Sequence, residues 1–397
     1  MLKLENGYNV GIEKKKVLSS KVIESFKEVS MNLPKVESKP NLKKISILHL
    51  GGTVASKVSY KTGGVVARFT PQEILALVPE LKDIAQIETR LIRNMFSEDM
   101  RFAHYNLIAK EIEKEVKNGA EGIIVTHGTD TIHYSSAALS FMLENLPIPV
   151  ILVGAQRSSD RGSSDAGLNL VCAASFIVNS TFKGVAVCMH ESSSDESCVI
   201  LHGCKVRKMH SSRRDAFRPI NGKPVGHVTK GKTIELIPAG VKMSGEFKVS
   251  FFKEKLKIGF LKSHPNLSAD EIKMFSKYDG VILEGTGLGH FPVDEIDEFT
   301  KEHTKILKEI KTLAKKIPVV MTTQCIFGRV DINVYESGRK LQEAGVLGNL
   351  LDMHPETAFI KLAFLLSNYK LKEVKESYSK NLRGEITERT EFEKDFL

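Results

Sequence analysis

Two hydrophobic runs in this chain each end in a glycine followed by a threonine. The first spans residues 45–53 and ends at Thr53, and the second spans residues 122–129 and ends at Thr129. Neither run alternates apolar with polar residues, which is typical of strands buried on both faces of a parallel sheet. Such a sheet presents ligands at the carboxyl ends of its strands, where glycine lets the backbone approach a small molecule. Two threonine hydroxyls at that edge therefore indicate a chemical site.

The same pattern continues along the chain and predicts two α/β domains of unequal size. The expected strands are 45–50, 122–126, 149–154 and 184–189, followed by 257–261, 279–284 and 318–323. The expected helices lie near 71–78, 102–118, 131–144 and 164–179, followed by 294–316, 335–344 and 356–367. We therefore expect a large domain over 43–235, a connector over 236–256 and a smaller domain over 257–397, both with mainly parallel sheets.

Residues 1–42 differ in character from the rest of the chain. Residues 2–12 predict a strand, an Asn-Gly turn and a second strand, and residues 36–44 have the polar composition of a linker. Two short strands cannot form an independent domain. The hairpin therefore either leans on the main body or belongs to a domain that is incomplete here.

The composition argues against several classes of protein. No stretch approaches the roughly 18 consecutive apolar residues of a membrane span, and the first residues lack the apolar core of a signal peptide. The five cysteines show no metal-ligand spacing, which indicates a reduced cytoplasm and no metal site. The net charge of +9 allows a polyanionic partner, but the excess is spread out and no RNA-recognition motif accompanies it.

Residues 226–233 match the P-loop pattern letter for letter. A working P-loop follows a hydrophobic strand and opens a helix. Here a polar stretch precedes the match, and a strand-like run that ends at Pro238 follows it. We expect no nucleotide site at this segment. A non-catalytic nucleotide-binding module is the alternative of a different class, and it depends on this match alone.

Thr129 is followed by Asp130, and both side chains can enter one cleft at the strand end. A threonine hydroxyl becomes a nucleophile only when a base takes its proton, and a lysine oriented by a carboxylate can serve. The segment 202–212 offers Lys205 and Lys208, and the residues alone do not choose between them. The structural alternative is that Asp130 simply caps the following helix.

Together these motifs resemble the bacterial-type L-asparaginase family over about residues 43–370. Residues 97–100 (Ser-Glu-Asp-Met) are similar to the family's substrate-binding Ser-Gln-Asp-Met, with glutamate in place of glutamine. Residues 206–212 fit the segment around the family's catalytic lysine, which selects Lys208 over Lys205. The resemblance implies two unequal three-layer α/β domains with mainly parallel sheets. The catalytic groups that it implies are Thr53, Thr129, Asp130 and Lys208.

The resemblance also implies the reaction. A threonine hydroxyl attacks a side-chain amide of glutamine or asparagine, ammonia leaves, and water hydrolyses the acyl-enzyme. We expect Thr53 to be the primary nucleophile, while the order in which the two threonines act stays open. Ser97 and Glu98 are expected to hold the α-carboxylate and α-ammonium of the substrate. Backbone amides near Gly128 and Thr129 are natural donors to the oxyanion.

A second set of segments resembles one branch of this family, the D subunits of archaeal glutamyl-tRNA(Gln) amidotransferases. The set comprises residues 4–12, 60–63, 352–357 and 384–389. The branch implies a glutaminase that passes ammonia to a partner, the E subunit, which amidates Glu-tRNA(Gln) with ATP and Mg. No cofactor is expected in this chain.

The branch further implies a homodimer within a cytoplasmic heterotetramer. It also leads us to expect that the N-terminal hairpin is the remnant of a small barrel. The alternative function is a free cytoplasmic L-asparaginase.

Overall fold

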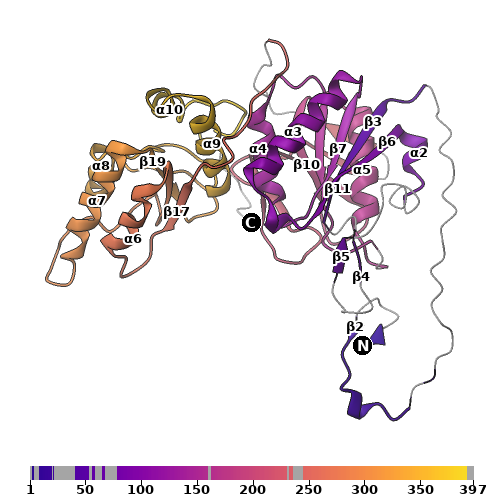
Figure 1. Ribbon diagram of the computed structural model, residues 1–397, viewed down its shortest axis with the longest axis horizontal. Helices are drawn as coiled ribbons and strands as arrows, with labels where there is room; N and C mark the ends of the chain where they lie inside the picture. The colour runs from indigo at the N-terminus through magenta and orange to yellow at the C-terminus, as the bar shows by residue number, and fades with distance from the viewer. Residues whose placement is uncertain are drawn as a thin grey trace.

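The computed structural model describes residues 2–3, 9–19, 21, 41–52, 56–58, 65–67, 78–159, 162–229, 232–235 and 245–390. Within these ranges the chain forms a large and a small α/β domain (Figure 1). Thr53, residues 60–63, the Asn-Gly turn and nearly all of the expected helix at 71–78 lie outside the described residues.

The large domain is built on an eight-stranded sheet with the order β15-β14-β11-β10-β9-β7-β3-β6. Its parallel strands are β3 (Lys44–Gly51), β6 (Gln86–Met95), β7 (Gly122–Thr126), β9 (Pro149–Val153) and β10 (Gly184–His190). The other three strands, β11 (Ser197–His202), β14 (Gly226–Thr229) and β15 (Lys232–Glu235), extend the sheet in antiparallel order.

Helices cover both faces of this sheet and make a three-layer domain. The helices α3 (Phe102–Lys117) and α4 (Ile132–Met142) lie on one face, and α5 (Ala166–Asn179) with the short α2 (Leu81–Ile84) lies on the other. Ile123 and Val125 of β7 pack toward the first face, whereas Ile124 packs toward the second. Burial on both faces explains why these strands read as unbroken apolar runs.

The small domain holds the parallel strands β17 (Ile258–Lys262), β18 (Gly280–Gly285) and β19 (Val319–Thr323). Its helices are α6 (Ala269–Lys273), α7 (Glu302–Lys316), α8 (Glu336–Glu343), α9 (Pro355–Asn368) and α10 (Leu371–Ser377). The helix α9 also packs against α4, and the rings of Phe364 and Phe141 stack with centroids 5.7 Å apart. It thereby joins the two domains, as Figure 1 shows.

Short elements complete the described structure. They are β1 (Leu2–Lys3), β2 (Asn9–Val10), β4 (Ser56–Val58), β5 (Val65–Ala67), β8 (Leu143–Glu144), β12 (Val206–Lys208), β13 (Phe217–Pro219), β16 (Lys248–Val249), η1 (Lys14–Lys16), η3 (Ser97–Asp99) and η4 (Met274–Lys277). The antiparallel pairing of β1 with β2 is the expected hairpin. None of the described helices combines the length and the apolar character needed to cross a membrane.

The two-domain α/β architecture is confirmed, with local differences that have physical causes. The helix expected from residue 131 ends at Met142, because Leu143 and Glu144 pair with β16 instead. The helix expected from residue 294 begins at Glu302. The domain boundaries near 235 and 256 stay a prediction, since residues 236–244 lie outside the described ranges.

The P-loop match does not form a P-loop. Residues 226–229 and 232–235 are the antiparallel strands β14 and β15, and β15 is an edge strand of the large sheet. A strand therefore stands where a phosphate-binding loop needs the first turn of a helix.

Candidate active site

The carboxyl edge of the large sheet brings the ends of β3 and β7 together. These strands are parallel neighbours, with His49 paired to Thr126. Gly52 has a φ of +74°, and a Cβ at this position would lie 2.6 Å from the backbone nitrogen of Gly128. Only glycine fits so close an approach. The first Gly-Thr motif thus meets the second through Gly52 and Gly128, although Thr53 itself lies outside the described residues.

Lys208 reaches this edge from β12, a strand of a separate two-stranded sheet. Its ammonium donates one hydrogen bond to Thr129 Oγ1 at 2.8 Å and another to Asp130 Oδ1 at 2.8 Å. The Lys208 side chain is 10% exposed, whereas that of Asp130 is 65% exposed. The arrangement places one amine between a threonine hydroxyl and a carboxylate, and an amine in this position can exchange a proton with the hydroxyl.

Lys205, three residues earlier in the same segment, contacts the small domain and not Thr129. Its Nζ is 2.8 Å from Asp352 Oδ2 of the small domain, and both side chains are buried. Burial lowers the pKa of Lys205, an effect that Asp352 opposes. The geometry therefore brings Lys208 to Thr129 and leaves Lys205 between the domains.

The expected substrate-binding residues flank Thr129. Ser97, in η3, is buried, and its carbonyl accepts a hydrogen bond from the Thr131 hydroxyl at 2.7 Å. Gly128 lies against Ser97, since a Cβ on Gly128 would be 2.7 Å from that of Ser97. The side chain of Glu98 is exposed beside them. Ser97 and Gly128 therefore form one wall next to Thr129, and the exposed side chain of Glu98 follows Ser97 in the chain.

The buried ring of His127 fixes the backbone of Gly128. His127 Nδ1 donates to the carbonyl of Gly128 at 2.7 Å, and its Nε2 accepts from Ser135 Oγ at 2.7 Å. Burial lowers the pKa of His127 to about 4, which keeps the ring neutral. The ring fixes the peptide that leads into Thr129. His127 was not among the residues expected at the site, although its place two residues before Thr129 was a usable signal.

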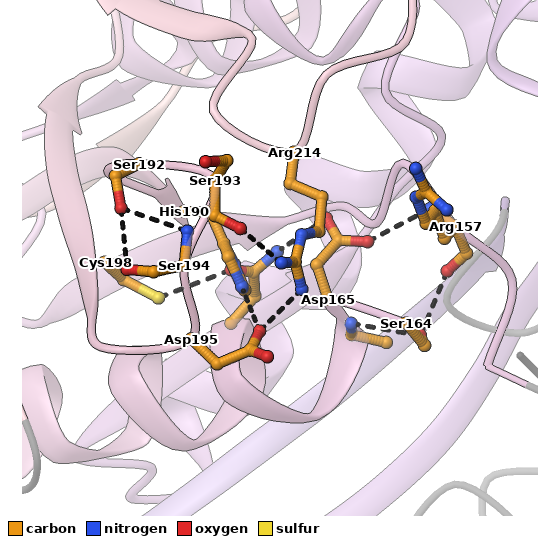
Figure 2. Close-up of polar contacts among 12 residues, drawn as sticks. Arg157, Ser164, Asp165, His190, Ser192, Ser193, Ser194, Asp195, Cys198 and Arg214 are labelled. Atoms are coloured by element: carbon orange, nitrogen blue, oxygen red, sulfur yellow. Dashed lines mark hydrogen bonds and ion pairs between the residues drawn. The ribbon is translucent and has the colours of Figure 1, made fainter. Parts of the chain in front are cut away.

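A loop after β9 closes the other side of Thr129. Gln156 Oε1 lies 3.5 Å from Thr129 Oγ1. The carboxylate of Asp165 accepts the backbone N–H groups of Gln156 and Arg157, each at 3.0 Å, and so holds the loop in place. Figure 2 shows Asp165 pointing toward Arg157. Among the described residues, no group of three or more His, Cys, Asp or Glu side chains could hold a metal ion.

Family models match both domains. The family described as "Asparaginase, N-terminal" matches residues 44–239, and "Glutaminase/Asparaginase C-terminal domain" matches residues 257–377. The chain therefore belongs to the asparaginase family.

The curated relatives define the branch more narrowly. The D subunit of glutamyl-tRNA(Gln) amidotransferase from Methanococcus maripaludis is 45% identical over 98% of this chain and 92% of that protein. The protein of the same name from Pyrococcus horikoshii is 43% identical over 99% of this chain and 88% of its own length. The resemblance to the amidotransferase D subunits is confirmed at nearly full length.

Solved structures agree with the fold. The thermostable L-asparaginase from Thermococcus kodakarensis superimposes with a TM-score of 0.77 at 32% identity, covering 87% of this chain and 99% of that one. L-asparaginase I from Vibrio cholerae gives 0.71 at 29% identity, with the same coverage of both chains. The asparaginase-type α/β fold is therefore confirmed.

Proposed function

We propose that this chain is the glutamine-hydrolysing subunit of a tRNA-dependent amidotransferase. The observation that carries the proposal is the Lys208 ammonium, held at 2.8 Å from both Thr129 Oγ1 and Asp130 Oδ1 at the carboxyl edge of the sheet. The names of the M. maripaludis and P. horikoshii relatives support the tRNA-dependent role.

In the proposed reaction, the Thr53 hydroxyl attacks the side-chain amide carbon of glutamine. Its proton passes to the leaving nitrogen, and ammonia departs, leaving a γ-glutamyl ester. Water then cleaves the ester to glutamate and restores the hydroxyl. We assign the proton transfers to Thr129, Lys208 and Asp130, because these three groups are joined by hydrogen bonds.

The contacts around Thr129 suggest how the substrate is held. We assign Ser97 to the α-carboxylate and the exposed Glu98 to the α-ammonium of glutamine. Backbone amides near Gly128 and Thr129 are proposed to stabilise the oxyanion of the tetrahedral intermediate. Gly128 lies directly against Ser97. This contact supports placing the oxyanion donors and the residue that binds the α-carboxylate on the same side of the substrate.

The partner in this proposal is the E subunit of the amidotransferase, which would bind ATP and Mg and receive Glu-tRNA(Gln). We propose that the chain forms a homodimer within a cytoplasmic heterotetramer. A monomer by light scattering at micromolar concentration, fully active alone, would contradict this assembly.

A free L-asparaginase is the second candidate, favoured by the superposition on the T. kodakarensis enzyme. Ammonia release from glutamine and from asparagine, measured with the full chain alone and after addition of the partner protein, ATP, Mg and Glu-tRNA, separates the two. A coupled glutaminase hydrolyses glutamine slowly until all components are present, and Gln-tRNA then forms. Rapid turnover of asparagine by the chain alone, with no response to partner and tRNA, would favour the asparaginase.

A further inference from the structure

His190, the last residue of β10, lies buried between two hydrogen-bond acceptors. Its Nδ1 is 2.6 Å from Asn169 Oδ1. Its Nε2 is 3.1 Å from Asp195 Oδ1, a contact that Figure 2 shows. The side chain of His190 is 0% exposed, while that of Asp195 is 67% exposed. A buried ring is thus linked directly to a surface carboxylate.

The amide of Asn169 has a defined orientation. Its Nδ2 donates to the carbonyl of Gly154 at 3.0 Å and faces Asp165 Oδ2 at 3.4 Å. Its Oδ1 also accepts from Cys198 Sγ at 3.3 Å. The oxygen of this amide, and not its nitrogen, therefore faces His190.

Two acceptors require two donors. A neutral imidazole carries one N–H and one lone pair, so one of its nitrogens would face an acceptor oxygen without a proton. The doubly protonated ring satisfies both contacts, and Asp195 balances its charge. The pKa of Asp195 is lowered by the hydrogen bond from His190 and by the neighbouring Arg214, which agrees with this arrangement.

Hydrogen bonds from the partners of His190 reach two loops, the β12–β13 loop that follows Lys208 and the loop of Gln156 beside Thr129. On one side, Asp195 accepts from Arg214 Nη1 at 2.6 Å, and Arg214 also donates to the carbonyl of Ser193. Arg214 lies six residues after Lys208, in the loop that joins β12 to β13.

On the other side, Asn169 binds Gly154 and faces Asp165, which holds the loop of Gln156 beside Thr129. One continuous set of hydrogen bonds therefore spans from the Thr129 loop to the Lys208 loop.

We propose that His190 is a positioning residue whose imidazolium ties these two loops together and so maintains the contact of Lys208 with Thr129. This inference rests on the glutaminase function proposed above. It makes the turnover rate depend on Asp195, a surface residue that touches neither Thr129 nor Lys208. A substitution or binding event in the exposed segment 192–196 would therefore alter the positions of the two loops at the candidate site.

The other groups around His190 do not replace Asp195 as its counter-ion. Its side chain lies on the α5 face of the sheet, as Ala186 and Cys188 of the same strand do. β9 presents only apolar residues there. Among the described residues, the titratable or charged side chains that contact His190, Asn169, Asp195 or Cys198 here are Cys188, Cys198, Cys172, Asp165, Asp195 and Arg214. Burial raises the pKa of the Cys188 thiol, and Asp165 is separated from the ring by Asn169.

The first test compares Asp195→Asn with Glu196→Gln in the full chain with its partner. Both side chains are exposed on the same loop, so both variants should fold, and each removes one negative charge. Among the described residues, Glu196 has no ion pair or hydrogen bond, which makes it a matched control. For Asp195→Asn we expect kcat for glutamine hydrolysis to fall on the order of tenfold, with little change in KM.

The second test measures the protonation of the ring directly and needs no substrate. The ¹⁵N signals of His190, identified by their absence in His190→Gln, should show an N–H on both ring nitrogens, as the two acceptor contacts require. A neutral ring would overturn the proposal, as would kinetics of Asp195→Asn that match those of Glu196→Gln. A wild-type chain that hydrolyses no glutamine would contradict the proposed function instead, and the ring signals would then decide this inference alone.

Discussion

Lys205 and Asp352 form an ion pair buried between the two domains, with Nζ and Oδ2 2.8 Å apart. Asp352 also accepts the backbone N–H of Thr387 at 3.1 Å and the hydroxyl of the same residue. The segment that leads into β12 is therefore held by the small domain three residues before Lys208.

Lys205→Met should destabilise the fold without removing a reacting group. The change leaves the buried Asp352 carboxylate without its cation, with only the hydrogen bonds from Thr387, which costs about 3–5 kcal/mol of unfolding free energy. Urea unfolding measures this loss, and Lys232→Met, at an exposed position of β15, is the control with an expected change within about 0.5 kcal/mol. Full stability together with lost hydrolysis in Lys205→Met would instead give Lys205 a chemical role.

Gly128→Ala should damage the site through a direct clash. The added methyl group would lie 2.7 Å from Ser97 Cβ and 2.8 Å from its Oγ, so the wall beside Thr129 must shift. We expect kcat/KM for glutamine to fall on the order of 10²-fold. Gly162→Ala is the control, because a Cβ there meets none of the described atoms within 4 Å. Equal kinetics in the two variants would show that Gly128 does not line the site.

Acid should destabilise the protein through its buried histidines. Burial lowers the pKa of His49, His127 and His202 to about 4 and that of His133 to about 3, from an ordinary value of 6.5. The unfolded chain therefore binds more protons than the folded chain below about pH 6.5, and stability falls as the pH drops toward 4.

Each of these groups contributes up to about 1.4 kcal/mol per pH unit in that window. Urea midpoints measured across the window should show the fall, and His49→Gln should reduce its slope. A matched variant at the exposed His264 should leave the slope nearly unchanged. A stability that is flat from neutral pH to about pH 4.5 would contradict neutral buried rings.

The P-loop match at residues 226–233 gives a test that separates a nucleotide-binding role from the edge-strand structure. Lys232 lies on the edge strand β15, far in the sheet order from β3 and β7. Lys232→Ala should leave glutamine hydrolysis unchanged, and titration of the chain alone with ATP should show no specific binding. Loss of activity in this variant would revive the nucleotide-binding interpretation.

The elements that are buried on both faces could be read from the sequence. β7 was predicted at its observed bounds, because a buried parallel strand is an unbroken apolar run that ends in a turn. The antiparallel strands β11 and β14 were not expected, and β15 was anticipated only as the strand-like run before Pro238. The last two are short and mix polar with apolar residues, so no period of two or 3.6 stands out.

The candidate site also has features that the sequence predicts and features that it does not. The spacing of Thr129 and Asp130 indicated a shared cleft, yet the choice of Lys208 needed the family resemblance, because Lys205 and Lys208 are three residues apart in one segment. Contacts that join several loops are even harder to predict from the sequence. Nothing in the spacing of His190, Asn169 and Arg214 indicates that they meet. The position of Thr53 stays a prediction.

The central claim is that Lys208 moves the protons for amide hydrolysis together with Thr129 and Asp130. Ammonia release from glutamine by Lys208→Ala, in the complex with its partner protein and Glu-tRNA, tests it most directly. We predict a loss of ~10³-fold or more, since groups that act as a unit are each essential, with the urea midpoint unchanged. Hydrolysis by Lys208→Ala near the wild-type rate would contradict the claim.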